Sequence, residues 1–105
     1  MVAKTERNNQ IRRDRRSIIA TLRMIYPGSM DGEELFRIIL GNNPEFDRRL
    51  LVKDLNYLHE KGFVSFRGNA GIDVHAISVR DCAFRLTATG TEVADQLVDE
   101  PTLDV

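Results

Sequence analysis

Hydrogen-bond donors gather on one face of a single predicted helix near the middle of the sequence. On a helical wheel, Arg49, Lys53 and Asn56 share one side. Arg48 and Val52 flank them. Arg and Lys donate to guanine O6 and N7 or to phosphate oxygens, and Asn pairs with adenine through two hydrogen bonds. This face therefore carries side chains suited to binding nucleic acid.

Other reactive residues lack the spacing of a catalytic or metal site. His59, His75 and Cys82 do not fall at metal-ligand spacing. As the single cysteine, Cys82 cannot form an intramolecular disulfide, and we expect it to be a small buried residue. The sequence has no P-loop, nucleophile elbow, Rossmann glycine pattern or paired catalytic carboxylates. We expect no enzyme activity, catalytic residue, metal, cofactor or small-molecule ligand.

Length and composition indicate one soluble domain. The chain has 105 residues, of which 42% are hydrophobic and 30% are charged, and one modest core fits this size. No window approaches the ~18 consecutive apolar residues of a membrane span, and the polar N-terminus does not resemble a secretory signal. We therefore expect a cytoplasmic protein with no membrane partner.

The charge is unevenly distributed along the chain, although the net charge is only −1. Seven basic residues and two acidic residues between positions 4 and 23 give a local charge of +5. Five acidic residues and no basic residue between positions 91 and 105 give −5. This asymmetry indicates either a basic binding surface or two oppositely charged ends that attract each other.

The first two helices are predicted from apolar periodicity and capping residues. The first begins near Ile11, with Asn9 as its N-cap, and ends at Pro27. The second follows Asp31, which forms a capping-box pattern with Glu34. Gly41 with the two following asparagines closes the second helix. The residue before its cap, Met30, fits a very short strand.

The third helix is predicted over residues 48–61. With Asp47 as the N-cap, Phe46 and Leu51 form the apolar pair of a hydrophobic staple. The buried stripe of this helix consists of leucines spaced i, i+4 and i+7, namely Leu51, Leu55 and Leu58. Gly62 would end the helix in the left-handed conformation.

The C-terminal half predicts a hairpin and a last helix. Residues 63–67 and 82–86 are expected to be strands, and "GNAG" at 68–71 a turn. The alternating stretch "IDVHAISV" at 72–79 also has an extended pattern. Thr87 is the expected N-cap of a helix that ends near Val98.

Three stretches resemble winged helix-turn-helix proteins, in the expected order. "RRSIIATLRMI" resembles their first helix, and "DLNYLHEKGFVSF" resembles the end of their recognition helix and the start of the wing. "FRLTATGTEVAD" resembles the close of the wing in regulators of the MarR, ArsR and PadR types. The layout "DLxxLxxxGxV … LTxxG" is also similar, more faintly, to small winged-helix proteins of Mu-like phages.

This resemblance implies an α+β fold, a winged helix-turn-helix with a three-helix core, a β-hairpin wing and a C-terminal helix. The domain would span residues 11–98, after a flexible arm at 1–10 and before a disordered acidic tail at 99–105. Two features depart from the pattern. The turn before the third helix is longer than the usual 3–4 residues, and the long wing segment predicts an extra strand or an extended tip.

The same resemblance implies a transcriptional regulator that binds specific sequences of double-stranded DNA. The third helix would lie in the major groove, and Arg67 beside the wing turn would contact a phosphate or the minor groove. The first-helix arginines would approach the flanking backbone, stay in solvent, or pair with acidic residues of a partner. A homodimer formed through the first helix, the last helix or both would present paired modules to the two half-sites of a palindromic DNA site. The alternative function is a winged-helix module that recruits a protein partner and has little DNA affinity.

Overall fold

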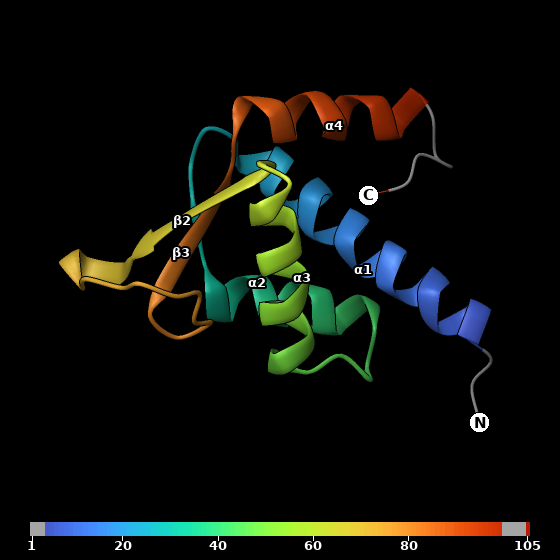
Figure 1. The fold of residues 1–105 in the computed structure, drawn as a ribbon, viewed down its shortest axis with the longest axis horizontal. Helices are drawn as coiled ribbons and strands as arrows, with labels where there is room; N and C mark the ends of the chain where they lie inside the picture. The colour runs from blue at the N-terminus through green and yellow to red at the C-terminus, as the bar shows by residue number, and fades with distance from the viewer. Residues whose placement is uncertain (1–3, 100–104) are drawn as a thin grey trace.

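A computed structural model describes residues 4–99 and 105, and its fold is α+β. It contains four α-helices and one three-stranded antiparallel sheet among the described residues (Figure 1). The elements are α1 (Lys4–Ile25), β1 (Met30–Asp31), α2 (Gly32–Asn42), α3 (Arg48–Glu60), β2 (Val64–Gly68), the 3-10 turn η1 (Asn69–Gly71), β3 (Cys82–Leu86) and α4 (Ala88–Asp99).

Helix α1 is longer than the sequence pattern predicts. It begins at Lys4 rather than near Ile11, so residues 4–10, predicted as an arm before the domain, are helical. Residues 1–3 lie outside the described part. Asn9 is an exposed residue inside the helix, not its N-cap. The extra turns carry no apolar stripe, but they also contain no Gly or Pro to interrupt a helix. Apolar periodicity marks the packed part of a helix and misses an exposed extension.

The caps of α2 and α3 behave differently. Asp31 precedes α2, but its side chain makes no capping hydrogen bond, so the predicted capping box is wrong. Its Oδ1 instead accepts a hydrogen bond from Asn69 Nδ2 at 2.9 Å. Asp47 is the N-cap of α3, as predicted, because its Oδ1 accepts from Leu50 N at 2.9 Å. Gly62 follows α3 with a φ of +82°, which confirms the predicted left-handed residue.

The core lies where α1 packs against the other helices and the sheet. Contacts join α1 to α2, α3, α4 and β3, so this helix is central to the domain (Figure 1). The three stripe leucines of α3 are fully buried in the same cluster as Phe46, which confirms their predicted inward face. Each buried leucine contributes roughly 1.5–3 kcal/mol of transfer free energy. The burial of this stripe fixes the rotation of α3 about its own axis.

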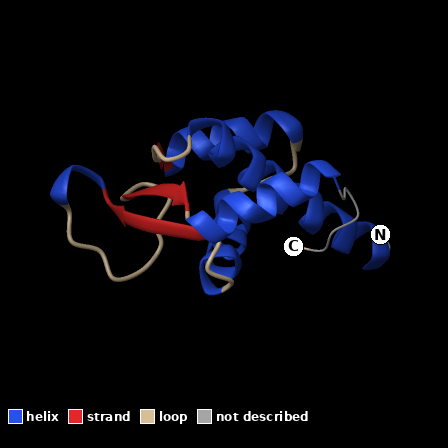
Figure 2. Cartoon of the chain, turned by 90° about the horizontal axis from the view of Figure 1, so that it is seen from above, coloured by secondary structure: helices blue, strands red, loops and turns tan. Residues whose placement is uncertain are grey.

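The sheet has the order β1-β3-β2, and the predicted short strand at Met30 is present. Strands β2 and β3 form a hairpin that extends to one side of the helices (Figure 2). Residues 72–81, which we call the return loop, form neither strand nor helix, so the alternating pattern at 72–79 is part of an extended hairpin end and not an extra strand. The pattern reflects partial burial, because Ile77 and Val79 are buried while Ile72 is exposed.

The C-terminal helix begins as predicted. Thr87 Oγ1 accepts from Gly90 N at 3.0 Å and donates to the Gly62 carbonyl, which joins the start of α4 to the end of α3. Of the predicted disordered tail, Asp99 is the last residue of α4 and Val105 is buried. Residues 100–104 lie outside the described part of the chain.

The first prediction concerns the close approach of α2 to the return loop of the hairpin. A Cβ on Gly32 would lie 2.2 Å from the Val79 carbonyl oxygen, whereas a Cβ on Gly41 would meet no atom within 4 Å. We expect Gly32→Ala to lower the free energy of unfolding by about 1–3 kcal/mol, because backbone must move. Gly41→Ala should be neutral or stabilising, since Ala is the better helix former. Urea unfolding measures both, and equal effects would contradict the close contact.

Candidate nucleic-acid interface

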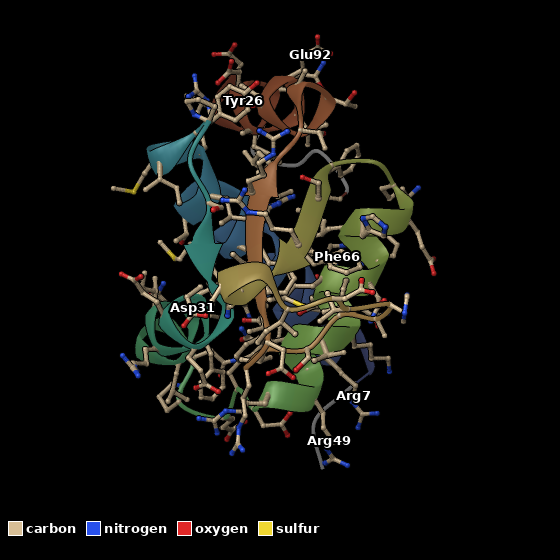
Figure 3. All side chains as sticks on the ribbon, turned by 90° about the vertical axis from the view of Figure 1, so that its left-hand side faces the viewer. Arg7, Tyr26, Asp31, Arg49, Phe66 and Glu92 are labelled. Carbon is tan, nitrogen blue, oxygen red and sulfur yellow. The ribbon has the colours of Figure 1, made fainter. Side chains whose placement is uncertain are left out.

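Helix α3 presents a polar face to solvent because its leucine stripe is buried on the opposite side. The α3 face, as we use the name, consists of Arg49, Lys53 and Asn56, all of which are exposed. The Arg49 side chain is 95% exposed, and its Nη2 is 3.9 Å from Asp47 Oδ2. Figure 3 shows Arg49 projecting at one end of the molecule. Such an exposed ion pair is weak and leaves the guanidinium accessible to a ligand.

Arg48 is engaged within the chain. Its Nε and Nη2 donate to the two carboxylate oxygens of Glu33 at 3.0 and 2.9 Å, and its guanidinium lies 4.5 Å from the Phe36 ring centroid. These hydrogen bonds lower the pKa of Glu33 and raise the pKa of Arg48. Arg48 therefore connects α3 to α2, and its charge is offset locally. Of the two adjacent arginines, Arg49 is the more available for an external anion.

Val52 lies in a shallow groove between α3 and the return loop of the hairpin. The groove has a volume of about 410 Å³, and Val52 and Val79 belong to its apolar part. Arg80 of the loop also lines it, together with Arg48 and Arg49. The sequence pattern did not assign Arg80 to this surface, because a loop without strand pairing gives no register from which to place it.

Asn56 is exposed, but part of its amide is already used. Its Nδ2 donates to the Val52 carbonyl oxygen at 2.9 Å, one turn back in α3. A bidentate contact with adenine needs both the amide N–H and the carbonyl oxygen. Such a contact would have to compete with the hydrogen bond inside the helix.

Arg67 does not lie with the α3 face. On β2 the ring of Phe66 meets His59 of α3, with 5.0 Å between the ring centroids (Figure 3). Because side chains alternate along a strand, Arg67 points to the opposite side of the sheet. The structure therefore separates Arg67 from the five α3 residues that the sequence prediction grouped with it.

Two first-helix arginines form ion pairs with other helices of the chain. Arg23 Nε lies 3.1 Å from Asp95 Oδ1 of α4, and Arg15 Nε lies 3.3 Å from Asp54 Oδ1 of α3. The first pair joins the basic N-terminal segment to the acidic C-terminal segment, as one of the two sequence interpretations expects. The Arg15 guanidinium also lies 3.6 Å from the Tyr57 ring centroid.

Asp54 is a buried carboxylate on the inner side of α3. It is 5% exposed, and burial raises its pKa from 3.8 to about 6, an effect opposed by Arg15 and reinforced by Asp14. A carboxylate removed from water loses hydration that one arginine replaces only in part. Asp54 therefore connects α3 to α1 through Arg15, and the free energy needed to keep its carboxylate ionised makes the stability of the fold depend on pH.

Neither a metal-ligating cluster nor a membrane-spanning helix is found among the described residues. Across residues 4–99 and 105, no group of three or more His, Cys, Asp or Glu side chains is arranged to hold a metal ion. Within the same residues, no helix combines the length and apolar character of a membrane span. Cys82 is a buried free thiol whose Sγ lies 3.4 Å from Ser78 N, where it helps to fold the return loop.

The chain matches no family model, no curated protein and no solved structure. What its surface can bind therefore follows from its own geometry and charge.

The second prediction uses the raised pKa of Asp54. Because the folded pKa lies above the unfolded value of 3.8, the native state binds the proton more tightly. The stabilisation of the folded state by protonated Asp54 is complete below pH ~4 and is lost as the pH rises through about 6. We expect Asp54→Asn to gain about 1–3 kcal/mol in unfolding free energy, relative to the natural chain, between pH 4 and pH 7.

Urea unfolding at several pH values measures this difference. Asp95→Asn is the matched control, because Asp95 is an exposed partner of an arginine. A difference between Asp54→Asn and the natural chain that does not vary with pH would show that Asp54 has an ordinary pKa.

Proposed function

We propose that this chain is a winged helix-turn-helix domain that binds double-stranded DNA as a transcriptional regulator. The order of its elements supports this proposal, because three helices precede a hairpin and a last helix closes the domain. The observation that carries it is the α3 face, which stands exposed because the leucine stripe is buried on the other side.

The dimensions of α3 suit a major groove. Its 13 residues give a length of about 20 Å, and the groove of B-DNA is about 12 Å wide. Arg49 and Lys53 would donate to phosphates or to guanine. Asn56 would bind adenine in place of its hydrogen bond to the Val52 carbonyl oxygen. Residues 43–47 form a turn longer than the 3–4 residues of a standard helix-turn-helix, as the sequence predicts.

The third prediction separates base reading from phosphate binding. If Lys53 contacts a phosphate, Lys53→Ala should flatten the plot of log K against log salt by about one unit. If Arg49 reads a base, Arg49→Ala should cost about 1–3 kcal/mol and relax the preference at one base pair. Binding of DNA sequences first selected from a random pool at ~150 mM salt provides the measurement.

Lys61→Ala is the matched control for these variants. Lys61 is an exposed cation at the C-terminal end of α3, where it lies 5.6 Å from the Tyr57 ring centroid. The Lys61→Ala variant removes one positive charge, as Lys53→Ala does, but at the other end of the helix. If all three variants bind DNA equally well, or if the chain binds none, the alternative of a protein-recruiting module gains support.

We also propose that the chain acts as a homodimer through α1 and α4. An apolar groove of about 380 Å³ lies between these helices, and Leu97 and Val98 line it with Ile19. Val98 is 80% exposed, and Met24 on α1 is 86% exposed. A large exposed apolar side chain that lines such a groove, as Val98 does, is typical of an interaction surface.

The fourth prediction tests this interface. We expect light scattering to give a mass near twice the 12.0 kDa of one chain, and Val98→Asp to return the mass to that of a monomer, because a second copy would bury the new carboxylate. Ile72→Asp is the control, since Ile72 is an exposed apolar residue of the hairpin tip. A single-chain mass for the unaltered protein at working concentration would remove the homodimer from the proposal.

A further inference from the structure

The sheet has an outer face on which arginines from two strands come together. Ser65 pairs with Arg85 across the ladder, and Arg67 pairs with Ala83. The alternate residues of β3, including Phe84, are buried in the core. Arg67 and Arg85 therefore point to the same outer side and are diagonal neighbours, a spacing that long side chains easily bridge.

This outer face is hollowed. A concavity of about 530 Å³ lies between the strands and the turn that leads from α1 to β1. We call it the outer hollow, and its lining includes Arg67, Arg85, Ser65, Ser29 and Ala83. Ala83 lies opposite Arg67 and two residues before Arg85 on β3, and its small side chain leaves space that a larger residue would fill.

The charge of the outer hollow is unbalanced. Arg67 and Arg85 are both exposed, and none of the described residues that line the hollow is acidic. The nearest carboxylate in the same row of paired residues is that of Asp31, which lies on β1 and pairs with Ala83 of β3. This carboxylate already accepts a hydrogen bond from Asn69. Two like charges on one sheet face repel each other, and an anion between them would turn this repulsion into attraction.

The donors of the outer hollow fit an oxyanion with several oxygens. Arg85 Nε lies 3.3 Å from Ser65 Oγ, a contact that orients the guanidinium and leaves its two Nη groups to donate elsewhere. Arg67 adds a second guanidinium fork, and Ser29 adds a hydroxyl. Guanidinium forks bind phosphate oxygens through paired, charge-assisted hydrogen bonds.

We infer that the outer hollow binds a phosphate group between Arg67 and Arg85. The hollow lies on the side of the sheet away from α3, so it does not rest on the proposed role of the α3 face. The phosphate has two sources with the same chemistry, namely the backbone of a nucleic acid and a free phosphorylated small molecule.

The fifth prediction tests the hollow with inorganic phosphate. The full chain, labelled with nitrogen-15, is titrated at constant ionic strength while NMR follows backbone amides and arginine Nε–Hε signals. We expect saturable shifts at Arg67, Arg85 and Ser65. The double variant Arg67→Gln/Arg85→Gln should weaken this binding at least about tenfold, since it removes two charge-assisted contacts. Arg37→Gln, an exposed arginine of α2, is the matched control and should retain it.

A second arm uses duplex DNA to identify the source of the phosphate. If the DNA backbone occupies the hollow, the double variant should lower the slope of log K against log salt by about two. Saturable phosphate shifts without this change in slope would assign the hollow to a small phosphorylated ligand. If neither measurement responds to the double variant, the proposal is overturned. Arg49→Ala should leave the phosphate shifts unchanged, so failure of the α3 proposal is distinguishable from failure of this one.

Discussion

Burial of the leucine stripe of α3 is the constraint on which the rest of the structure depends. Leu51, Leu55 and Leu58 are fully buried, and they fix α3 against α1 and the sheet. Since a helix has one orientation about its axis, the burial of one side decides which residues meet solvent on the other. The exposure of Arg49 and Lys53 is therefore a consequence of core packing and needs no separate interaction to maintain it.

Polar contacts then connect the neighbouring elements to this core. Arg48 joins α3 to α2 through Glu33, and Asn69 joins the hairpin turn to β1 through Asp31. Gly32 lets the return loop approach the start of α2. These contacts hold the loop near α3, where Arg80 reaches the same groove as Arg49. The loop that leads back to β3 therefore forms one surface with α3, while the hairpin tip extends away from the helices (Figure 2).

Pairing within the chain explains how a nearly neutral protein keeps local basic surfaces. Several arginines are matched with carboxylates of other elements, and such pairs contribute to the arrangement of helices more than to external binding. Exposed cations remain on the α3 face, namely Arg49 and Lys53, and on the outer face of the sheet, namely Arg67 and Arg85. The matched pairs are Arg15 with Asp54, Arg23 with Asp95, and Arg48 with Glu33.

The sequence by itself determined the elements whose signals are local. Apolar spacing predicted α3 and its buried side, and the capping residues Asp47, Gly62 and Thr87 marked where helices begin or end. Only the tertiary structure decided which side chains meet across elements. It placed Arg67 on the sheet side opposite α3, because that depends on strand register, and it used Asp31 for a distant asparagine and not for a cap. Long-range pairing of this kind leaves no periodic trace in a single sequence, since the partners are fixed by packing and not by spacing.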